Sequence, residues 1–72
     1  MRTQTAISRA VYRQLDGTPS RALAERIGVD HTVVYAWLQG QQDMTIDDVD
    51  ALAEGLEMSP WELIELAASA RK

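Results

Sequence analysis

Hydrogen-bonding side chains recur at helical spacing between positions 31 and 42 of this 72-residue chain. Residues three and four apart share one face of a helix. The apolar side chains expected to point inward are Val34, Trp37 and Leu38. The opposite stripe then contains Thr32, Tyr35, Ala36 and Gln39. A threonine hydroxyl can donate or accept at a base edge, and small apolar groups such as Val33 and Ala36 suit a thymine methyl. Tyr35 can reach a base or a phosphate oxygen with its hydroxyl.

Phosphate-binding groups precede this stripe in the sequence. Ser20 and Arg21 stand at the predicted start of a helix, where unpaired backbone N–H groups favour anions. Arg9 and Arg13 lie one helical turn apart on an earlier helix and are further candidates for phosphate contact. The alternative for Arg9 and Arg13 is an ordinary solvated helix face.

Catalytic and metal-binding residue sets are absent from the sequence. The chain has no cysteine and one histidine, His31, so a histidine–cysteine metal site is excluded. The acidic stretch at 43–50 lacks the glycine and terminal glutamate of a calcium loop. A nucleophile–base set, a carboxylate pair in a pocket and a phosphate loop are missing too. We therefore expect no enzyme, no metal, no cofactor and no small-molecule substrate.

Length and composition favour one small globular domain over residues 1–72. A chain of this size supports a single modest core. No apolar run approaches the roughly 20 residues that span a bilayer, and the N-terminus lacks the apolar segment of a signal peptide. These features predict a cytoplasmic protein that does not bind membranes.

Charge is unevenly distributed along the chain. Residues 1–42 contain five arginines and three acidic residues, whereas residues 43–72 contain eight acidic and two basic residues. The net charge is -4, which is unusual for a nucleic-acid-binding domain. The asymmetry nevertheless allows one face to approach phosphate while another repels it.

Apolar residues recur at helical spacing throughout, so we predict an all-α fold of five helices. The predicted helices span residues 5–15, 20–27, 31–39, 46–56 and 60–70. Gly28 ends the second helix, Asp30 caps the third and Thr45 caps the fourth. Ser59 and Glu62 form a capping box for the fifth.

The second and third predicted helices are separated by only three residues, so they must meet at a steep angle. Ala24 is small where they approach, Gly28 permits a left-handed turn, and Val34 points back into the core. This spacing is typical of a helix-turn-helix, which we place at residues 20–39.

Two consecutive segments resemble one known family, the phage Cro and repressor proteins, also called the xenobiotic-response-element type of helix-turn-helix domain. The segments are LAERIGVDHTVVYAWLQG and TIDDVDALAEGLEMSPWEL, and the resemblance covers residues 20 to about 66. Two features depart from the family pattern. Glu57 replaces the usual glycine, and the loop at 41–43 lacks the usual Lys and Arg.

This resemblance implies a compact bundle of the lambda-repressor type and a sequence-specific transcription regulator. Its third helix would enter the major groove of double-stranded operator DNA. The protein would repress transcription by occupying the operator, in a bacterial or phage-infected cell. His31 would contact a base with Thr32, Val33, Tyr35 and Ala36, although a surface histidine is the simpler alternative. Gln39 and Gln42 would lie near the sugar-phosphate backbone.

The fifth predicted helix has a second apolar stripe. Its inward face is accounted for by Leu63, Leu66, Ala67 and Ala70. Trp61 and Ile64 remain, and exposed apolar area on a small domain often marks an interface. We therefore predict a two-fold homodimer through Trp61 and Ile64, at least on DNA. The alternative is a monomer in which Trp61 folds over the core.

A second function remains open from the sequence. The acidic C-terminal half could dock a basic protein partner, as in an antitoxin-like or antirepressor protein on the same scaffold. The acidic pI favours this alternative, whereas the polar stripe of the third helix favours DNA.

Overall fold

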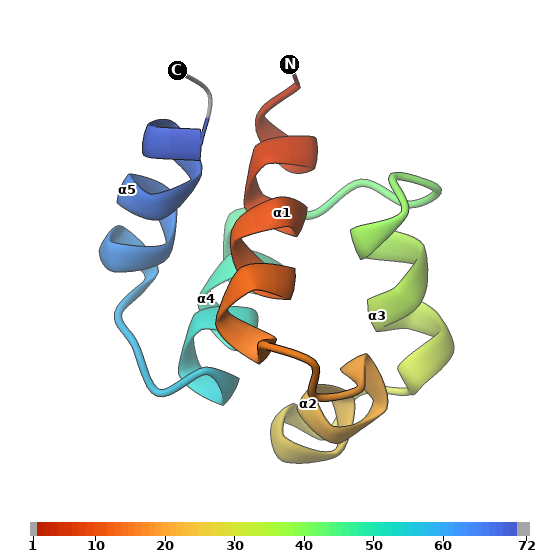
Figure 1. The fold of residues 1–72 in the computed structure, drawn as a ribbon. Helices are drawn as coiled ribbons and strands as arrows, with labels where there is room; N and C mark the ends of the chain where they lie inside the picture. The colour runs from red at the N-terminus through yellow and green to blue at the C-terminus, as the bar shows by residue number, and fades with distance from the viewer. Residues whose placement is uncertain (1, 71–72) are drawn as a thin grey trace.

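Five α-helices form the part of the chain that the computed structural model describes, residues 2–70 with only the backbone of Ala70 (Figure 1). They are α1 (Thr3–Leu15), α2 (Ser20–Ile27), α3 (His31–Leu38), α4 (Ile46–Gly55) and α5 (Pro60–Ala70). No strand occurs between residues 2 and 70. The predicted all-α fold is confirmed. The corrections concern helix ends: α1 begins two residues earlier than predicted, and α3 and α4 each end one residue earlier.

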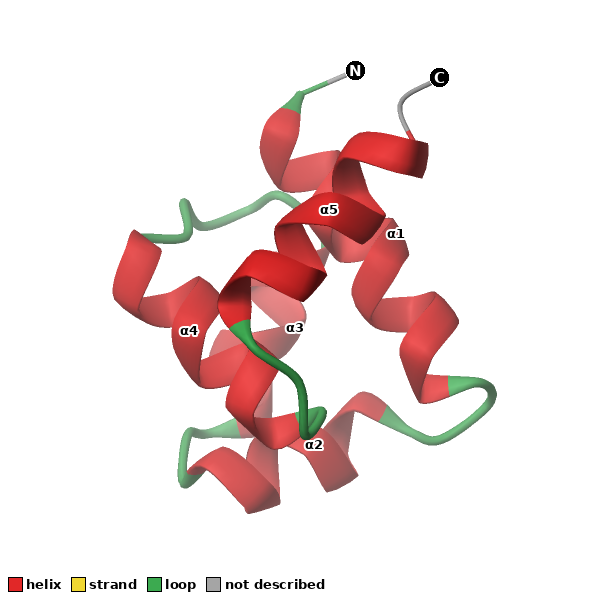
Figure 2. Cartoon of the chain, turned by 90° about the vertical axis from the view of Figure 1, so that its left-hand side faces the viewer, coloured by secondary structure: helices red, strands yellow, loops and turns green. Residues whose placement is uncertain are grey.

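Helix α1 organises the bundle because it packs against both α5 and α3. Figure 1 shows α1 between these two helices, with α5 on one side and α3 on the other. Figures 1 and 2 both show that α1 and α5 run in opposite directions. Helix α2 packs against α3 and α4, and α4 also packs against α5. Helices α1 and α2 therefore cover one side of α3, and no other helix of the described residues packs closely on its remaining surface.

The core is formed by one face of each helix. Its buried apolar residues are Ala6, Ile7, Ala10, Val11, Leu15, Leu23, Ala24, Val34, Trp37, Leu38, Val49, Leu52, Ala53, Leu63 and Ala67. On α1, Ile7, Ala10, Val11 and Leu15 recur at helical spacing and form its inward stripe. On α5, Leu66 is only half-buried, and the side chain of Ala70 lies outside the described residues. Each of the larger fully buried side chains contributes roughly 1.5–3 kcal/mol by leaving water.

Gly55 lets α4 approach α2 closely. A Cβ atom at this position would lie 2.6 Å from Ile27 Cγ2 and 2.6 Å from Leu23 Cδ1. Leu23 is fully buried and has little room to move. The absence of a side chain at residue 55 therefore sets how closely α2, and the helix-turn-helix that it begins, sits on α4.

Side-chain caps define the starts of α4 and α5. Thr45 Oγ1 accepts from the Asp48 N–H at 3.1 Å, and Asp48 Oδ2 accepts from the Thr45 N–H at 2.8 Å. This reciprocal pair is a capping box that the sequence analysis did not anticipate. Ser59 Oγ accepts from the Glu62 N–H at 3.1 Å, which confirms the predicted Ser59 cap of α5; the reciprocal bond from the Ser59 N–H to the Glu62 side chain is not among the hydrogen bonds of the described residues. Both connections into the C-terminal helices are thus held by local hydrogen bonds.

Glu57 ends α4 in a conformation that normally belongs to glycine. Its φ is +60°, in the left-handed region. The Met58 N–H donates to the Ala53 carbonyl and the Glu57 N–H donates to the Glu54 carbonyl, both at 3.0 Å. These two bonds define a Schellman motif. The backbone therefore keeps the turn that a glycine would make, although the residue is glutamate.

We expect Glu57→Gly to stabilise the protein by about 1 kcal/mol. The left-handed conformation costs a non-glycine residue roughly 1–2 kcal/mol. Glycine avoids this cost but loses more conformational entropy on folding, so the net gain in stability is smaller. Urea unfolding followed by tryptophan fluorescence measures the change. Glu57→Ala is the control, because it removes the charge but keeps Cβ. An equal gain from both variants would assign the effect to charge instead of backbone strain.

Candidate nucleic-acid interface

The turn between α2 and α3 is short and held by its own backbone. Gly28 adopts φ +71°, and the Val29 N–H donates to the Ala24 carbonyl at 3.1 Å. Ala24 is buried and Val29 is half-buried against the core. Asp30 then begins α3, because its Oδ1 accepts from the Thr32 N–H at 2.9 Å. The predicted cap and the predicted turn are both confirmed.

Helix α3 has one buried face and one face in solvent. Val34, Trp37 and Leu38 are buried, as predicted. Thr32 and His31 are exposed, and the Tyr35 side chain is 51% exposed. Ala36 and Val33 are half-buried, and Val33 packs partly against the core, so it presents less surface than its position suggested. The five predicted base-contacting residues thus lie at one end and along one side of α3. Three of them are exposed to solvent, whereas Val33 and Ala36 are half-buried.

A polar network covers the N-terminal end of α3. Thr32 Oγ1 donates to Asp30 Oδ1 at 2.7 Å. His31 Nδ1 lies 3.8 Å from the same carboxylate oxygen, and His31 Nε2 lies 3.4 Å from Arg21 Nη2. A guanidinium only donates, so His31 Nε2 accepts in this contact. The network links a predicted phosphate contact, Arg21, to a predicted base contact, His31. Thr32 is exposed, and its hydroxyl oxygen can still accept a hydrogen bond.

Asp30 is the ionisable group most affected by this network. The backbone N–H of Thr32, and then its hydroxyl, lower the pKa of Asp30 below its ordinary value of 3.8 by hydrogen-bonding to the carboxylate. The nearby His31 lowers the pKa further, and desolvation opposes these effects. The cap of α3 is therefore strongest when Asp30 is ionised.

The predicted backbone-contacting residues lie on α1, α2 and the end of α3. Ser20 is half-buried at the first position of α2, and Arg21 next to it is exposed. Arg9 and Arg13 are exposed, and neither forms an ion pair with any residue between 2 and 70. Arg26 is different, because its Nη1 donates to the Gly55 carbonyl at 3.2 Å. The arginines on α1 and α2 that remain available for an anion are Arg9, Arg13 and Arg21.

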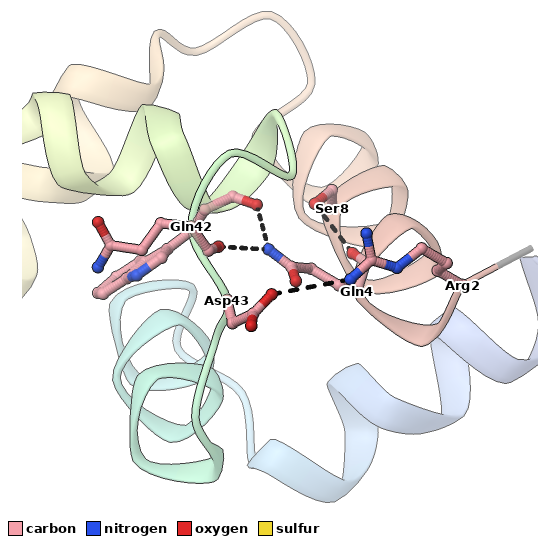
Figure 3. A network of polar contacts seen from close by, with 6 residues as sticks. Arg2, Gln4, Ser8, Gln42 and Asp43 are labelled. Atoms are coloured by element: carbon pink, nitrogen blue, oxygen red, sulfur yellow. Dashed lines mark hydrogen bonds and ion pairs between the residues drawn. The ribbon is translucent and has the colours of Figure 1, made fainter.

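A hydrogen-bond network ties the loop after α3 to α1 (Figure 3). Gln4 Nε2 donates to the Trp37 carbonyl at 2.9 Å and to the Gln42 carbonyl at 2.6 Å. Ser8 Oγ donates to the Gln4 carbonyl at 3.0 Å, and Arg2 Nη2 lies 3.7 Å from Asp43 Oδ1. The last turn of α3 and the exposed residue Gln42 are thus positioned by the beginning of α1.

Gln4 was not identified from the sequence, and neither was Tyr12, whose hydroxyl accepts from Gln39 Nε2 at 3.0 Å. Gln4 is 33 and 38 residues from its two partners, and Tyr12 is 27 residues from Gln39. No local pattern signals such contacts. An exposed tyrosine on α1, one turn from a predicted phosphate-binding arginine, is the one available hint.

An apolar groove lies away from α3, between the starts of α1, α4 and α5. It has a volume of about 490 Å³, and Ile7, Met44, Val49 and Pro60 contribute to its walls. The predicted interface residues Trp61 and Ile64 line it and are 73% and 42% exposed. Ile46 also lines the groove and is 87% exposed, although it was not among the interface residues predicted from the sequence. Asp47 and Asp50 form part of its edge.

Two further properties concern only the described residues. No group of three or more His, Cys, Asp or Glu side chains there could hold a metal ion. No described helix is long and apolar enough to cross a membrane.

The helix-turn-helix geometry with an exposed face on its second helix defines a class of DNA-binding domain. The chain matches the helix-turn-helix family over residues 10–63, and it therefore belongs to the Cro- and repressor-type helix-turn-helix family. Its fold is accordingly the all-α fold of the lambda-repressor type, and its function is that of a DNA-binding transcription regulator. Domains of this family are not typically enzymes. Searches of curated proteins and of solved structures returned no match.

The lowered pKa of Asp30 leads to a prediction about pH. Asp30→Asn keeps a capping oxygen but removes the ionisation. A carboxylate whose pKa is lower in the folded state stabilises the protein above the unfolded pKa, and this contribution is lost as pH falls through the folded pKa. We expect the parent protein to exceed Asp30→Asn in stability at pH 7 and to lose that advantage below the ordinary value of 3.8. Urea unfolding of both proteins between pH 7 and pH 3 measures the difference. A difference that stays constant with pH would contradict the assignment.

Proposed function

We propose that residues 1–72 form one DNA-binding domain that represses transcription by occupying a short operator, as phage Cro and repressor proteins do. Helix α3 enters the major groove, and His31, Thr32, Val33, Tyr35 and Ala36 contact base edges. The observation that carries this proposal is the solvent-exposed face of α3. That face bears hydrogen-bonding side chains although the opposite face is fully buried. No packing requirement accounts for the chemistry on the exposed side.

The distribution of charge supports this orientation. Arg9, Arg13 and Arg21 lie on α1 and α2 without carboxylate partners among the described residues. The acidic residues of the C-terminal half lie on α4, α5 and the loops beside them: Asp43, Asp47, Asp48, Asp50, Glu54, Glu57, Glu62 and Glu65. Phosphate is therefore attracted to the helix-turn-helix side of the domain and repelled from the other.

Backbone contacts surround the reading face in this proposal. Ser20 and Arg21 bind phosphate at the start of α2, and Arg9 and Arg13 bind it from α1. Gln39 and Gln42 contact the sugar-phosphate backbone beyond the end of α3. Support comes from Gln4, which holds the Gln42 backbone against α1, so the loop presents a defined surface. Such contacts fix register and orientation, while the α3 side chains supply sequence preference.

The operator-bound form that we propose is a two-fold homodimer. Trp61 and Ile64, with Ile46 beside them, form an apolar surface that a second copy would cover. Figure 1 shows α5 and α3 on opposite sides of α1, so copies joined near α5 hold their α3 helices far apart. The chain measures 31 × 24 × 24 Å. These dimensions suit two reading helices separated by roughly 34 Å, one turn of DNA.

A second candidate function rests on the same groove. Asp47 and Asp50 border its apolar floor, which is the chemistry that a basic amphipathic segment of another protein would fit. In this alternative the chain is a protein-binding module, antitoxin-like or antirepressor-like, and contact is made by the acidic C-terminal half.

Selection of bound duplexes from a random DNA pool tests the leading proposal. We expect the parent protein to enrich a palindromic sequence. The Thr32→Ala, Tyr35→Ala double variant should lose at least roughly 30-fold in preference for it, because each base contact contributes about 1–3 kcal/mol of discrimination.

The control is Glu65→Gln, an exposed change on α5, which should leave the selected sequence unchanged. Unchanged preference in the double variant would show that α3 is not the reading helix. No enrichment by a folded parent protein would favour the protein-binding alternative.

Sedimentation equilibrium, with and without operator DNA, tests the homodimer. We expect Trp61→Ser to weaken dimerisation roughly 30-fold, as truncating a central interface tryptophan does, while Glu65→Gln has little effect. Asp47 and Asp50 of two copies would repel across the groove, so added salt should tighten the dimer. A parent protein that stays monomeric both free and on DNA would contradict this interface.

A further inference from the structure

Tyr12 joins α1 to the end of α3 on the surface that carries Arg9 and Arg13. Gln39, the C-cap residue of α3, donates from Nε2 to Tyr12 Oη at 3.0 Å. The Tyr12 side chain is 42% exposed, so its hydroxyl is held at the surface without being enclosed. Neither the sequence analysis nor the family match assigns this residue a role.

The direction of the hydrogen bond determines what Tyr12 offers to a ligand. A phenol hydroxyl has one hydrogen to donate and an oxygen that accepts. Gln39 donates to that oxygen, and no residue between 2 and 70 accepts the hydroxyl hydrogen. Tyr12 is therefore prepared to donate outward, to a group that accepts hydrogen bonds. Phosphodiester oxygens only accept.

The charges around Tyr12 favour an anion. Arg9 precedes Tyr12 by three residues and therefore lies beside it on α1. Arg13 follows Tyr12 directly, so it does not face Tyr12 but adds a second positive charge to the exposed part of the same helix. Neither arginine is paired with a carboxylate among the described residues. Asp16, at the C-cap of α1, offsets one of these charges and leaves the other. An acceptor drawn to this surface is thus expected to be negatively charged.

We propose that Tyr12 is an additional DNA-backbone contact, whose hydroxyl donates to one phosphate oxygen while Gln39 orients the phenol. The inference rests on the proposed function, because it requires α3 to lie in the major groove. It extends that function by making Tyr12 and Gln39 one unit. A phosphate bound on α1 then also fixes the C-terminal end of α3, and with it the register of the reading helix.

Fluorescence anisotropy of labelled duplexes tests the contact, using Tyr12→Phe, which removes only the hydroxyl. We expect binding to weaken roughly tenfold, the loss typical of a hydrogen bond to a charged group, for the selected duplex and a scrambled duplex alike. The salt dependence should not change, because the phenol is neutral. Arg9→Gln should instead reduce the slope by about one. Gln14→Ala, on the side of α1 next to α5, is the matched control.

Replacing single phosphates of the operator with neutral methylphosphonates locates the partner. At one phosphate position in each half-site, the replacement should weaken DNA binding by the parent protein. The same replacement should not further weaken DNA binding by Tyr12→Phe. Adding Gln39→Met to Tyr12→Phe should cost less than the two separate losses combined, because the two side chains act together.

Three results would overturn the proposal. Tyr12→Phe could bind as tightly as the parent protein, with an unchanged melting temperature. The loss could be confined to the selected duplex, which would indicate a base contact instead. The parent protein could fail to bind any duplex, and that result, unlike the first two, would overturn the proposed function as well.

Discussion

Burial of one face of α3 is the constraint on which the arrangement of this domain depends. Trp37, Val34 and Leu38 lie in the core with α1 behind them. A helix of eight residues has no stability of its own in water, so this packing keeps it folded. The same packing fixes which residues face outward. Thr32 and Tyr35 stand in solvent because they lie on the side of the helix away from the buried residues.

Polar contacts then fix both ends of α3. At its start, Asp30 caps the helix and shares its carboxylate with Thr32, while His31 contacts Arg21. At its end, Gln4 bonds to carbonyls of the last turn and the following loop, and Gln39 bonds to Tyr12. Hydrogen bonds of this kind contribute about 1 kcal/mol each, less than the apolar core. Their effect is mainly geometric, because they hold a short helix in one orientation relative to α1 and α2.

The two halves of the chain carry surfaces of different charge and polarity. Helices α1 to α3 carry the available arginines and the exposed face of α3, whereas α4 and α5 carry the carboxylates and the apolar groove beside Trp61. A surface that repels phosphate is suited to contact with protein, and one that attracts it is suited to DNA. The negative net charge and the family's DNA-binding function are compatible, because eight of the eleven acidic residues lie from Asp43 onward, whereas Arg9, Arg13 and Arg21 on α1 and α2 have no carboxylate partner among the described residues.

The helices, their caps and the helix-turn-helix could be predicted from the sequence because they depend on contacts a few residues apart. Apolar spacing located five helices, and Asp30, Gly28 and Thr45 marked boundaries through local hydrogen bonds and backbone conformation. Only the tertiary structure decided which polar residues meet. The hydrogen bonds of Gln4 with Gln42 and of Tyr12 with Gln39 join segments that are distant in the chain. The same packing brings the apolar residues Ile46 and Trp61 to one groove. Periodicity places a side chain on a helix face, but the packing of helices decides what that face meets.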